Sequence, residues 1–311
     1  MCDIWQRKDG KELDLEDFRR HKESLVRLGV REVVLTGGEP LLHRGFEQLC
    51  LFFRECGIRI TLLTTGLLLS KRAEVVAAGV DEVIVSIDGP EQVHNEVRRI
   101  NGAFQLIAKG IQDVRQKKSR MPVNGRSTVQ KANHHLLRQT VAGAKSLSLD
   151  SISFLATDLT SQAFNRELIW PIDRQDEVAL SRAEVTALED EVEALIRENA
   201  GDISTRYIVE SPSKLRRIVR RFKEHFGEVA PIAPQCNAPW VSAVVEVDGS
   251  VRPCFFHQKI GSLVGNTLEQ VLNGEQARHF RASLDVDANP ICQKCVCSLN
   301  YKTTASAQLR G

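Results

Sequence analysis

The cysteines in the C-terminal part of the chain have the spacing of a metal site. Cys292 and Cys295 form a Cys-x2-Cys pair, which can present two thiolates to one metal centre. Cys236 and Cys254 can complete a four-sulfur set, and Cys297 is a fifth thiol that is left over or substitutes for one of the four. Four thiolates are suitable ligands for zinc and for a 4Fe–4S cluster alike. The sequence therefore predicts a metal centre here without deciding between the two.

A β-hairpin is expected to position Cys254. Two apolar runs, 241–247 and 251–253, are joined by Asp248-Gly249, and this dipeptide between apolar runs is typical of a tight hairpin turn. Cys254 follows the second run directly. We therefore expect a small C-terminal domain built around the thiols.

A second group of residues with possible chemistry follows the strand expected at 33–36, where β-branched and leucine residues indicate burial in a parallel sheet. Gly37-Gly38-Glu39-Pro40 comes directly after it. Two glycines let the backbone approach a ligand closely, and α/β folds bind ligands at the carboxyl ends of their parallel strands. An ordinary tight turn between strand and helix can have the same residues, so this tetrapeptide alone does not decide the function.

Polar residues also end the next strands. Thr65 follows the strand expected at 58–63, and Ser86 and Asp88 end the strand expected at 82–87. Each alone can be a turn or a cap. Because the carboxyl ends of parallel strands meet at one edge of a sheet, we expect these side chains to line one pocket with residues 37–40.

Strands and helices alternate through the first half of the chain, with strands expected at 33–36, 58–63, 82–87, 126–131 and 151–155. Repeating units of this kind predict an α/β fold with parallel strands joined by right-handed crossovers. The pattern fits an open sheet and a barrel equally. Further on, an acidic helix at 180–199 and a basic helix at 213–226 are expected to face solvent and each other, rather than nucleic acid.

Composition places the chain among ordinary globular proteins, with 311 residues, 42% hydrophobic and 26% charged residues, and a net charge of +2. This charge favours neither nucleic acid nor an anionic membrane surface as a partner. No apolar run approaches the roughly 20 residues that span a bilayer, and the polar start does not resemble a signal peptide. We expect a cytoplasmic protein, in which eight cysteines indicate metal binding rather than disulfides.

The first residues, Met1-Cys2-Asp3-Ile4-Trp5, resemble the end of a known cluster-binding loop. Radical S-adenosylmethionine (SAM) enzymes carry this loop as C-x3-C-x2-C, and Asp-Ile-Trp follows the third cysteine in many members. The start of the chain is therefore similar to the radical SAM superfamily. The resemblance implies that Cys2 is a catalytic residue and a ligand of a 4Fe–4S cluster.

Later motifs extend this resemblance over essentially the whole chain. Residues 37–40 resemble the family motif that hydrogen-bonds the amino group of SAM, and 64–66 resemble T-N-G, with threonine in place of asparagine. Residues 86–90, together with His94 and Arg98, resemble an S-x-D-G-P…H…R stretch. The C-terminal cysteine pattern resembles the SPASM or twitch extension, which binds auxiliary 4Fe–4S clusters.

The resemblance implies a partial (β/α)6 TIM-like barrel of the radical SAM type that lacks its first strand, followed by a SPASM/twitch-like domain. The expected core covers residues 1–170, a helical linker covers 171–230, and the auxiliary cluster domain covers 231–311.

The implied chemistry is reductive cleavage of SAM by a catalytic 4Fe–4S cluster, followed by hydrogen abstraction from a peptide or a cofactor precursor. A low-potential donor such as flavodoxin or ferredoxin is the implied electron source. The implied SAM-binding residues are Gly37, Gly38, Glu39, Pro40, Thr65, Ser86 and Asp88, and the implied auxiliary metal ligands are Cys236, Cys254, Cys292, Cys295 and Cys297.

The cluster loop departs from the family because only its third cysteine, Cys2, is present. A single thiolate cannot hold the catalytic cluster, so the chain as printed is not expected to cleave SAM. Two accounts stay open. Met1 can be an internal methionine of a protein whose upstream strand carries the other two cysteines, or the protein can be a non-catalytic iron–sulfur or zinc-binding remnant. Retention of the motif at 37–40 favours the first account.

Overall fold

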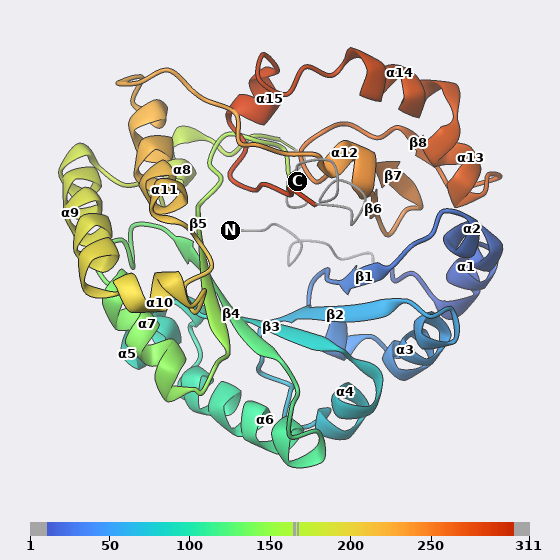
Figure 1. Cartoon of the computed structure of the whole chain (residues 1–311), viewed down its shortest axis with the longest axis horizontal. Coiled ribbons are helices and arrows are strands. Elements are labelled where there is room, and N and C mark those ends of the chain that lie inside the picture. The colour runs from blue at the N-terminus through green and yellow to red at the C-terminus, as the bar shows by residue number, and fades with distance from the viewer. Residues whose placement is uncertain (1–10, 164–165, 167, 302–311) are drawn as a thin grey trace, which may run out of the picture. The chain divides into compact units, whose positions relative to one another are not determined.

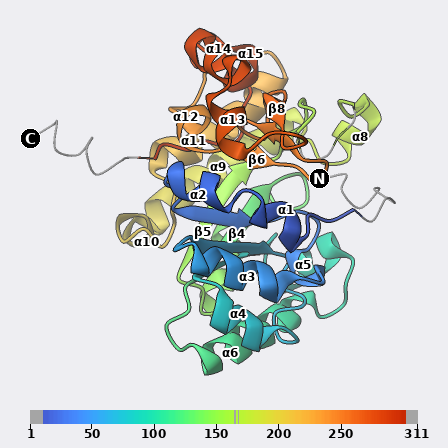
Figure 2. The same cartoon turned by 90° about the vertical axis from the view of Figure 1, so that its right-hand side faces the viewer.

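The computed structural model describes residues 11–163, 166 and 168–301. Its contacts divide the chain into two compact units. One comprises Met1–Gly29, Thr160–Ile169 and Ala230–Gly311, and the other comprises Val30–Leu159 and Trp170–Val229. We call them the thiol unit and the sheet unit, and Figures 1 and 2 show their elements.

The sheet unit is built on five parallel strands in the order of the sequence: β1 (Glu32–Leu35), β2 (Arg59–Thr64), β3 (Glu82–Ser86), β4 (Val123–Val129) and β5 (Ser151–Ala156). All five strands were predicted from the sequence, but β4 begins three residues earlier than expected. Asn124-Gly125 resembles a turn signal, yet both residues lie within β4. A Cβ at Gly125 would lie 2.9 Å from Leu149, so close packing explains this glycine.

Amphipathic helices cover one face of this sheet, as Figure 2 shows for α3, α4 and α6. The sheet contributes fully buried apolar side chains such as Ile60 and Val83 to the core between the layers. The elements between the strands are η2 (Pro40–Leu42), α3 (Phe46–Glu55), α4 (Ala73–Gly79), α5 (Glu91–Arg98), α6 (Ala103–Lys117) and α7 (Leu137–Ser146). Residues 99–102 separate α5 from α6.

The helices expected as a separate linker pack within the sheet unit. They are α8 (Ile172–Asp176), α9 (Arg182–Glu198), α10 (Ala200–Ser204) and α11 (Pro212–His225). Helix α9 contacts α7, and α11 contacts β5, because both helices carry an apolar face. The acidic and basic helices also pair directly: Arg216 forms two hydrogen bonds, 2.6 and 2.8 Å long, with Glu193, and Lys223 contacts Glu189 at 2.6 Å.

The first described elements of the thiol unit are α1 (Leu15–Arg19) and α2 (Lys22–Arg27). The helical periodicity of residues 13–28 predicts one continuous helix here. The break follows Arg20, and His21 is turned inward, with 9% of its surface exposed. Helix α2 packs on α13, and Arg27 Nε lies 2.7 Å from Glu269. The other elements are α12 (Ala238–Val241), the antiparallel strands β6 (Val244–Val245), β7 (Ser250–Arg252) and β8 (Gly261–Ser262), α13 (Leu268–Asn273), α14 (Glu275–Ser283) and α15 (Pro290–Gln293).

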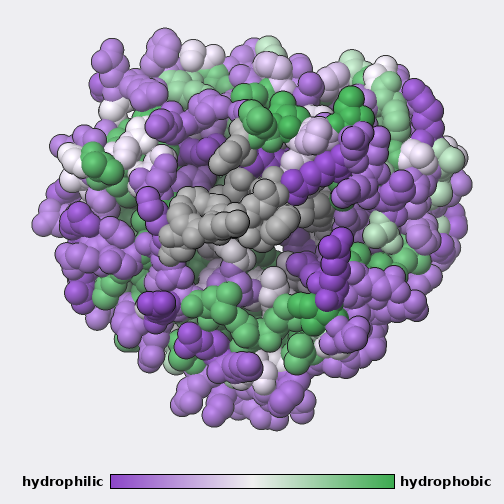
Figure 3. Space-filling model, turned by 180° about the vertical axis from the view of Figure 1, so that it is seen from behind, coloured by the Kyte–Doolittle hydropathy of each residue, from purple (hydrophilic) through white to green (hydrophobic). Residues whose placement is uncertain are grey.

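Hydrophilic side chains make up most of the face seen in Figure 3. Among the residues that the structure describes, no helix has both the length and the apolar composition needed to cross a membrane.

Candidate functional site

The Gly-Gly-Glu-Pro turn follows β1 at the carboxyl edge of the sheet. Gly37 has φ +139°, a conformation that favours glycine, and among the described residues no atom would lie within 4 Å of a Cβ on Gly37 or Gly38. Both glycines are exposed. Pro40 is buried and begins η2. The turn therefore presents bare backbone beside open space, which fits the close approach of a ligand.

The carboxylate of Glu39 joins this turn to the end of β2. Its Oε1 accepts hydrogen bonds from Thr64 Oγ1 at 2.7 Å and from the Leu41 amide at 3.2 Å. Its Oε2 accepts from Thr65 through the amide at 2.8 Å and through Oγ1 at 2.5 Å. These four bonds match the roughly four lone-pair positions of a carboxylate. Glu39 therefore fixes the geometry of the turn.

Asp88 lies just beyond β3 and is only 4% exposed. Arg98 Nε donates to its Oδ2 at 2.6 Å, and His94 Nδ1 lies 3.4 Å from the same oxygen and 3.2 Å from the Asp88 amide. Burial alone would raise the pKa of Asp88, but His94 and Arg98 outweigh it, so this pKa lies below its ordinary value. Asp88 is therefore a buried anion paired with Arg98 from α5.

Asn133 connects the end of β3 to the end of β4. It is 2% exposed, and its Nδ2 donates to the carbonyls of Asp88 at 2.8 Å and Thr128 at 3.0 Å. Its Oδ1 accepts from the Gln130 amide at 2.8 Å. Ser86 is the half-buried last residue of β3. The polar residues at these strand ends thus form two hydrogen-bonded groups, one around Glu39 and one around Asp88 and Asn133.

Four cysteines line one cavity of about 30 Å³ in the thiol unit. They are the four preferred ligands of the sequence prediction, and the cavity is lined by Pro234, Cys236, Pro239, Cys254, Phe256, His257, Val286, Ile291, Cys292 and Cys295. Apolar and prolyl groups thus surround the sulfur atoms. Thiolates in an apolar shell are the donor set that an iron–sulfur cluster uses, so the residues present fit such a cluster.

Three local structural features bring these cysteines together. Cys254 follows β7, as the hairpin prediction required, and Cys292 lies in α15, where Asn289 Oδ1 accepts from the Cys292 amide at 3.2 Å. Asn237, next to Cys236, pairs with the chain near its end: its amide donates to the Leu299 carbonyl at 2.7 Å. Segments distant in sequence therefore meet at one cavity.

The thiols lie close enough to influence one another. Burial, together with Cys254 and Cys236, raises the pKa of Cys292 to about 11, and burial also raises the pKa of Cys295. Cys295 Sγ donates to the carbonyl of Cys297 at 2.9 Å, and Cys297 does not line the cavity. Without a bound metal these groups are thiols, and binding must release their protons.

Within the described part of the chain, no three His, Cys, Asp or Glu side chains converge as they would on a single ion. A structural zinc ion is held by four ligands around one point, either cysteine sulfurs at about 2.3 Å or histidine nitrogens at about 2.0–2.1 Å. A 4Fe–4S cluster places each thiolate on a different iron, so its sulfur ligands lie farther apart. Four cysteines that share one cavity are a donor set for either kind of centre.

His257 is a site residue that the sequence prediction missed. It lines the thiol cavity, and its Nε2 lies 3.3 Å from Cys292 Sγ. The signal was present as a Cys254-x2-His257 spacing, which has the same offset as Cys292 and Cys295. The predicted catalytic ligand Cys2 lies outside the described residues. Cys50 is 1% exposed, and burial raises its pKa to about 12, as expected for a small buried core residue rather than a reactive thiol.

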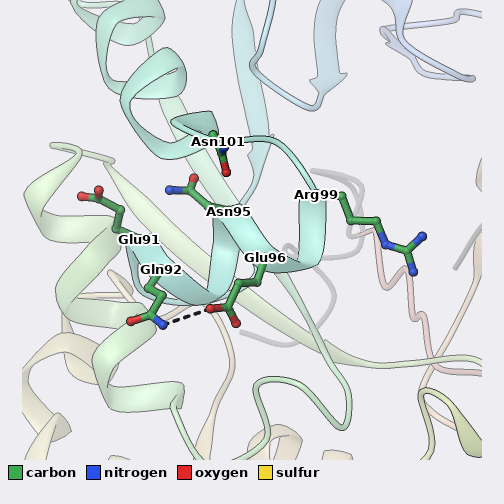
Figure 4. Close-up of a pocket in the computed structure, with 6 residues that line it drawn as sticks. All are labelled: Glu91, Gln92, Asn95, Glu96, Arg99 and Asn101. Atoms are coloured by element: carbon green, nitrogen blue, oxygen red, sulfur yellow. Dashed lines mark hydrogen bonds between the residues drawn. The ribbon is translucent and has the colours of Figure 1, made fainter.

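A larger hollow of about 620 Å³ lies along α5, lined by Glu91, Gln92, Asn95, Glu96, Arg99 and Asn101. Figure 4 shows that Gln92 hydrogen-bonds Glu96, at 3.0 Å, and that the Arg99 side chain points away from the other five. Gln92 and Glu96 thus bond to each other, and the Arg99 side chain is directed away from the hollow. Nothing in it resembles a reaction centre.

Comparison with protein families gives two matches. The radical SAM superfamily matches residues 1–130, and a family described as an iron–sulfur cluster-binding domain, SPASM, matches residues 236–296. The second match begins at Cys236 and includes Cys254, Cys292 and Cys295. The chain therefore contains a radical SAM domain in its N-terminal part and a SPASM domain in its C-terminal part.

Curated relatives align over different lengths. The AdoMet-dependent heme synthase of Methanosarcina barkeri is 31% identical over 44% of this chain and 39% of that protein. A probable GTP 3',8-cyclase of Methanococcus maripaludis is 23% identical over 91% of this chain and 88% of that protein. The first alignment thus spans well under half of the heme synthase.

Solved structures share the fold. Native anSMEcpe with bound AdoMet superposes with a TM-score of 0.65 and 17% identity, covering 94% of this chain and 82% of that one. SuiB of Streptococcus suis bound to the precursor peptide SuiA gives a TM-score of 0.57 and 13% identity, covering 96% and 68%. The predicted superfamily, fold class and cofactor class, an iron–sulfur cluster with SAM, are confirmed. The individual site residues and the electron donor remain predictions.

Proposed function

We propose that this protein binds SAM at the carboxyl edge of its parallel sheet and begins radical chemistry on a peptide or a cofactor precursor. The observation that carries this proposal is the Glu39 carboxylate, whose four hydrogen bonds fix the glycine turn against the end of β2. A turn held so firmly, with open space beside both glycines, is preorganised for a ligand.

Within this proposal, the backbone at Gly37 and Gly38 receives the methionyl end of SAM, while Glu39 positions the turn. Ser86 contacts the remainder of SAM, and Asp88 acts with Arg98 to hold the end of β3 in place. When bound, the catalytic cluster supplies one-electron reductive cleavage of SAM, and Cys2 is its ligand in this chain. The protein's own contribution is to position the reactants and exclude water.

We further propose that Cys236, Cys254, Cys292 and Cys295 hold an auxiliary 4Fe–4S cluster. Four thiolates provide one ligand for each iron, which leaves no open position for substrate. This supports electron transfer rather than substrate binding as the role of the auxiliary cluster. The external electron source is then a low-potential donor of the flavodoxin or ferredoxin class.

The substrate class follows from the relatives. Those named above include a heme synthase and a GTP cyclase, and one solved neighbour is bound to a precursor peptide. These names support a cofactor precursor and a peptide as the two classes to test.

The test is SAM cleavage by protein purified anaerobically from the cells that produce it. With SAM and a strong reductant, we expect 5′-deoxyadenosine from the unaltered protein and none from Cys2→Ala, both measured by mass spectrometry. Cys56→Ala is the matched cysteine control, because Cys56 lies outside both predicted sites, and it should retain activity. Equal product from Cys2→Ala would refute the proposed role of Cys2. No product from protein that retains its metal would support the alternative, a non-catalytic metal-binding module.

A further inference from the structure

The His257 ring is held firmly inside the thiol cavity. It is 4% exposed and packs edge-to-face on Phe280, with ring centroids 4.9 Å apart. Its Nε2 lies 3.3 Å from Cys292 Sγ, within hydrogen-bond distance for sulfur. The Arg252 side chain also donates to the His257 carbonyl, at 3.4 Å. The ring therefore has a fixed orientation toward one particular sulfur.

Metal binding determines the direction of this hydrogen bond. A free Cys292 thiol can donate its proton to Nε2 or accept one from it. A cysteine that ligates iron is deprotonated, so its sulfur can only accept. Nε2 must then carry the proton and donate it to sulfur, as the neutral imidazole can do.

We propose that His257 donates Nε2–H to the sulfur of Cys292 and thereby raises the reduction potential of the auxiliary cluster. Hydrogen bonds to cluster sulfurs are one of the factors that set this potential. The bond favours the reduced state because the added electron increases the negative charge on the sulfurs. His257 is a positioning residue here and not a ligand, since four cysteines already line the cavity. The proposal rests on the auxiliary cluster of the proposed function.

The test is a redox titration followed by electron paramagnetic resonance. It is carried out on Cys2→Ala protein, in which the C-terminal cysteines are the proposed cluster site. We expect His257→Phe to lower the ratio of reduced to oxidised cluster about tenfold at a fixed potential, a shift of about 59 mV to more negative values for one electron. His257→Gln, whose amide can still donate, should recover most of the shift. His279→Phe, an exposed position on α14, should leave the potential unchanged.

A second measurement needs no variant at position 257. Pulsed resonance spectra in H2O and D2O should reveal an exchangeable proton coupled to the reduced cluster, and 15N-histidine labelling should show only weak coupling to nitrogen. Absence of the exchangeable proton, strong coupling from an iron-bound nitrogen, or an unshifted potential in fully loaded His257→Phe would each overturn the proposal. If Cys2→Ala protein contains no cluster at all, the auxiliary cluster of the proposed function fails instead.

Discussion

Single side chains in this protein fix the backbone conformation at the candidate SAM site. Glu39 illustrates this best, because all four of its hydrogen bonds go to the protein itself. The motif at 37–40 could be recognised from the sequence because glycines followed a buried strand. The pairing of Glu39 with Thr64 and Thr65 could not, since these residues lie about 25 positions away and only the parallel register brings them together.

Thr65→Val tests the bracing of the glycine turn. The substitution keeps the side-chain shape but removes the Oγ1 donor, so one Glu39 oxygen loses a partner. We expect SAM to bind about tenfold more weakly, or about 1.4 kcal/mol, as measured by equilibrium dialysis. Thr65→Asn, which restores a donor, should recover affinity, and Thr186→Val on the exposed face of α9 should have no effect. Unchanged affinity in Thr65→Val would mean that Glu39 does not need this bond.

Asp88 predicts a definite pH dependence of stability. Its pKa is lower in the folded chain than its ordinary value, so the charged form stabilises the fold at neutral pH. This contribution is present above about pH 4, the unfolded value, and is lost as the pH falls through the folded pKa. Asp88→Asn should lower the free energy of unfolding by about 2 kcal/mol at pH 7. In urea titrations, the free energies of unfolding of Asp88→Asn and wild type should approach each other below pH 4. A difference that stays constant with pH would contradict the lowered pKa of Asp88.

At the scale of elements, hydrophobic periodicity was sufficient to predict all five strands of the sheet. It failed where a local signal conflicted with packing. Asn124-Gly125 resembles a turn but belongs to β4, and the helix expected at 13–28 breaks where His21 turns inward. The packing of α11 on β5 and of α9 on α7 was also missed, because an apolar helix face does not show which element it contacts.

Two glycines, Gly110 in α6 and Gly201 in α10, form a matched test of helix packing in the sheet unit. A Cβ at Gly110 in α6 would lie 2.5 Å from the Leu69 Cβ, whereas Gly201 in α10 has no atom within 4 Å. Gly110→Ala should lower the free energy of unfolding by about 1–3 kcal/mol through overpacking, although alanine favours helix. Gly201→Ala should raise it by up to about 1 kcal/mol. If both changes stabilise in chemical denaturation, the close packing of α6 on residue 69 is wrong.

At the scale of the whole molecule, the chain carries its two sets of chemical groups in different compact units. The glycine turn and the Asp88 network belong to the sheet unit, and the cysteine cavity belongs to the thiol unit. Cysteine spacing singled out the four cysteines that line this cavity because Cys-x2-Cys and a hairpin are local signals, and their role as metal ligands stays a prediction. His257 was missed because only cysteine spacing was considered, although Cys254-x2-His257 has the same offset as Cys292 and Cys295.

The measurement that tests this account most directly is the iron and sulfide content of anaerobically purified protein with single cysteine substitutions. Cys254→Ala and Cys295→Ala should each lower the iron content by up to about four atoms per chain, because each removes a ligand of the auxiliary cluster. Cys50→Ala, which removes a buried thiol from α3, should keep the wild-type iron content. The same iron content in all four proteins would contradict the assignment of the C-terminal cysteines as cluster ligands.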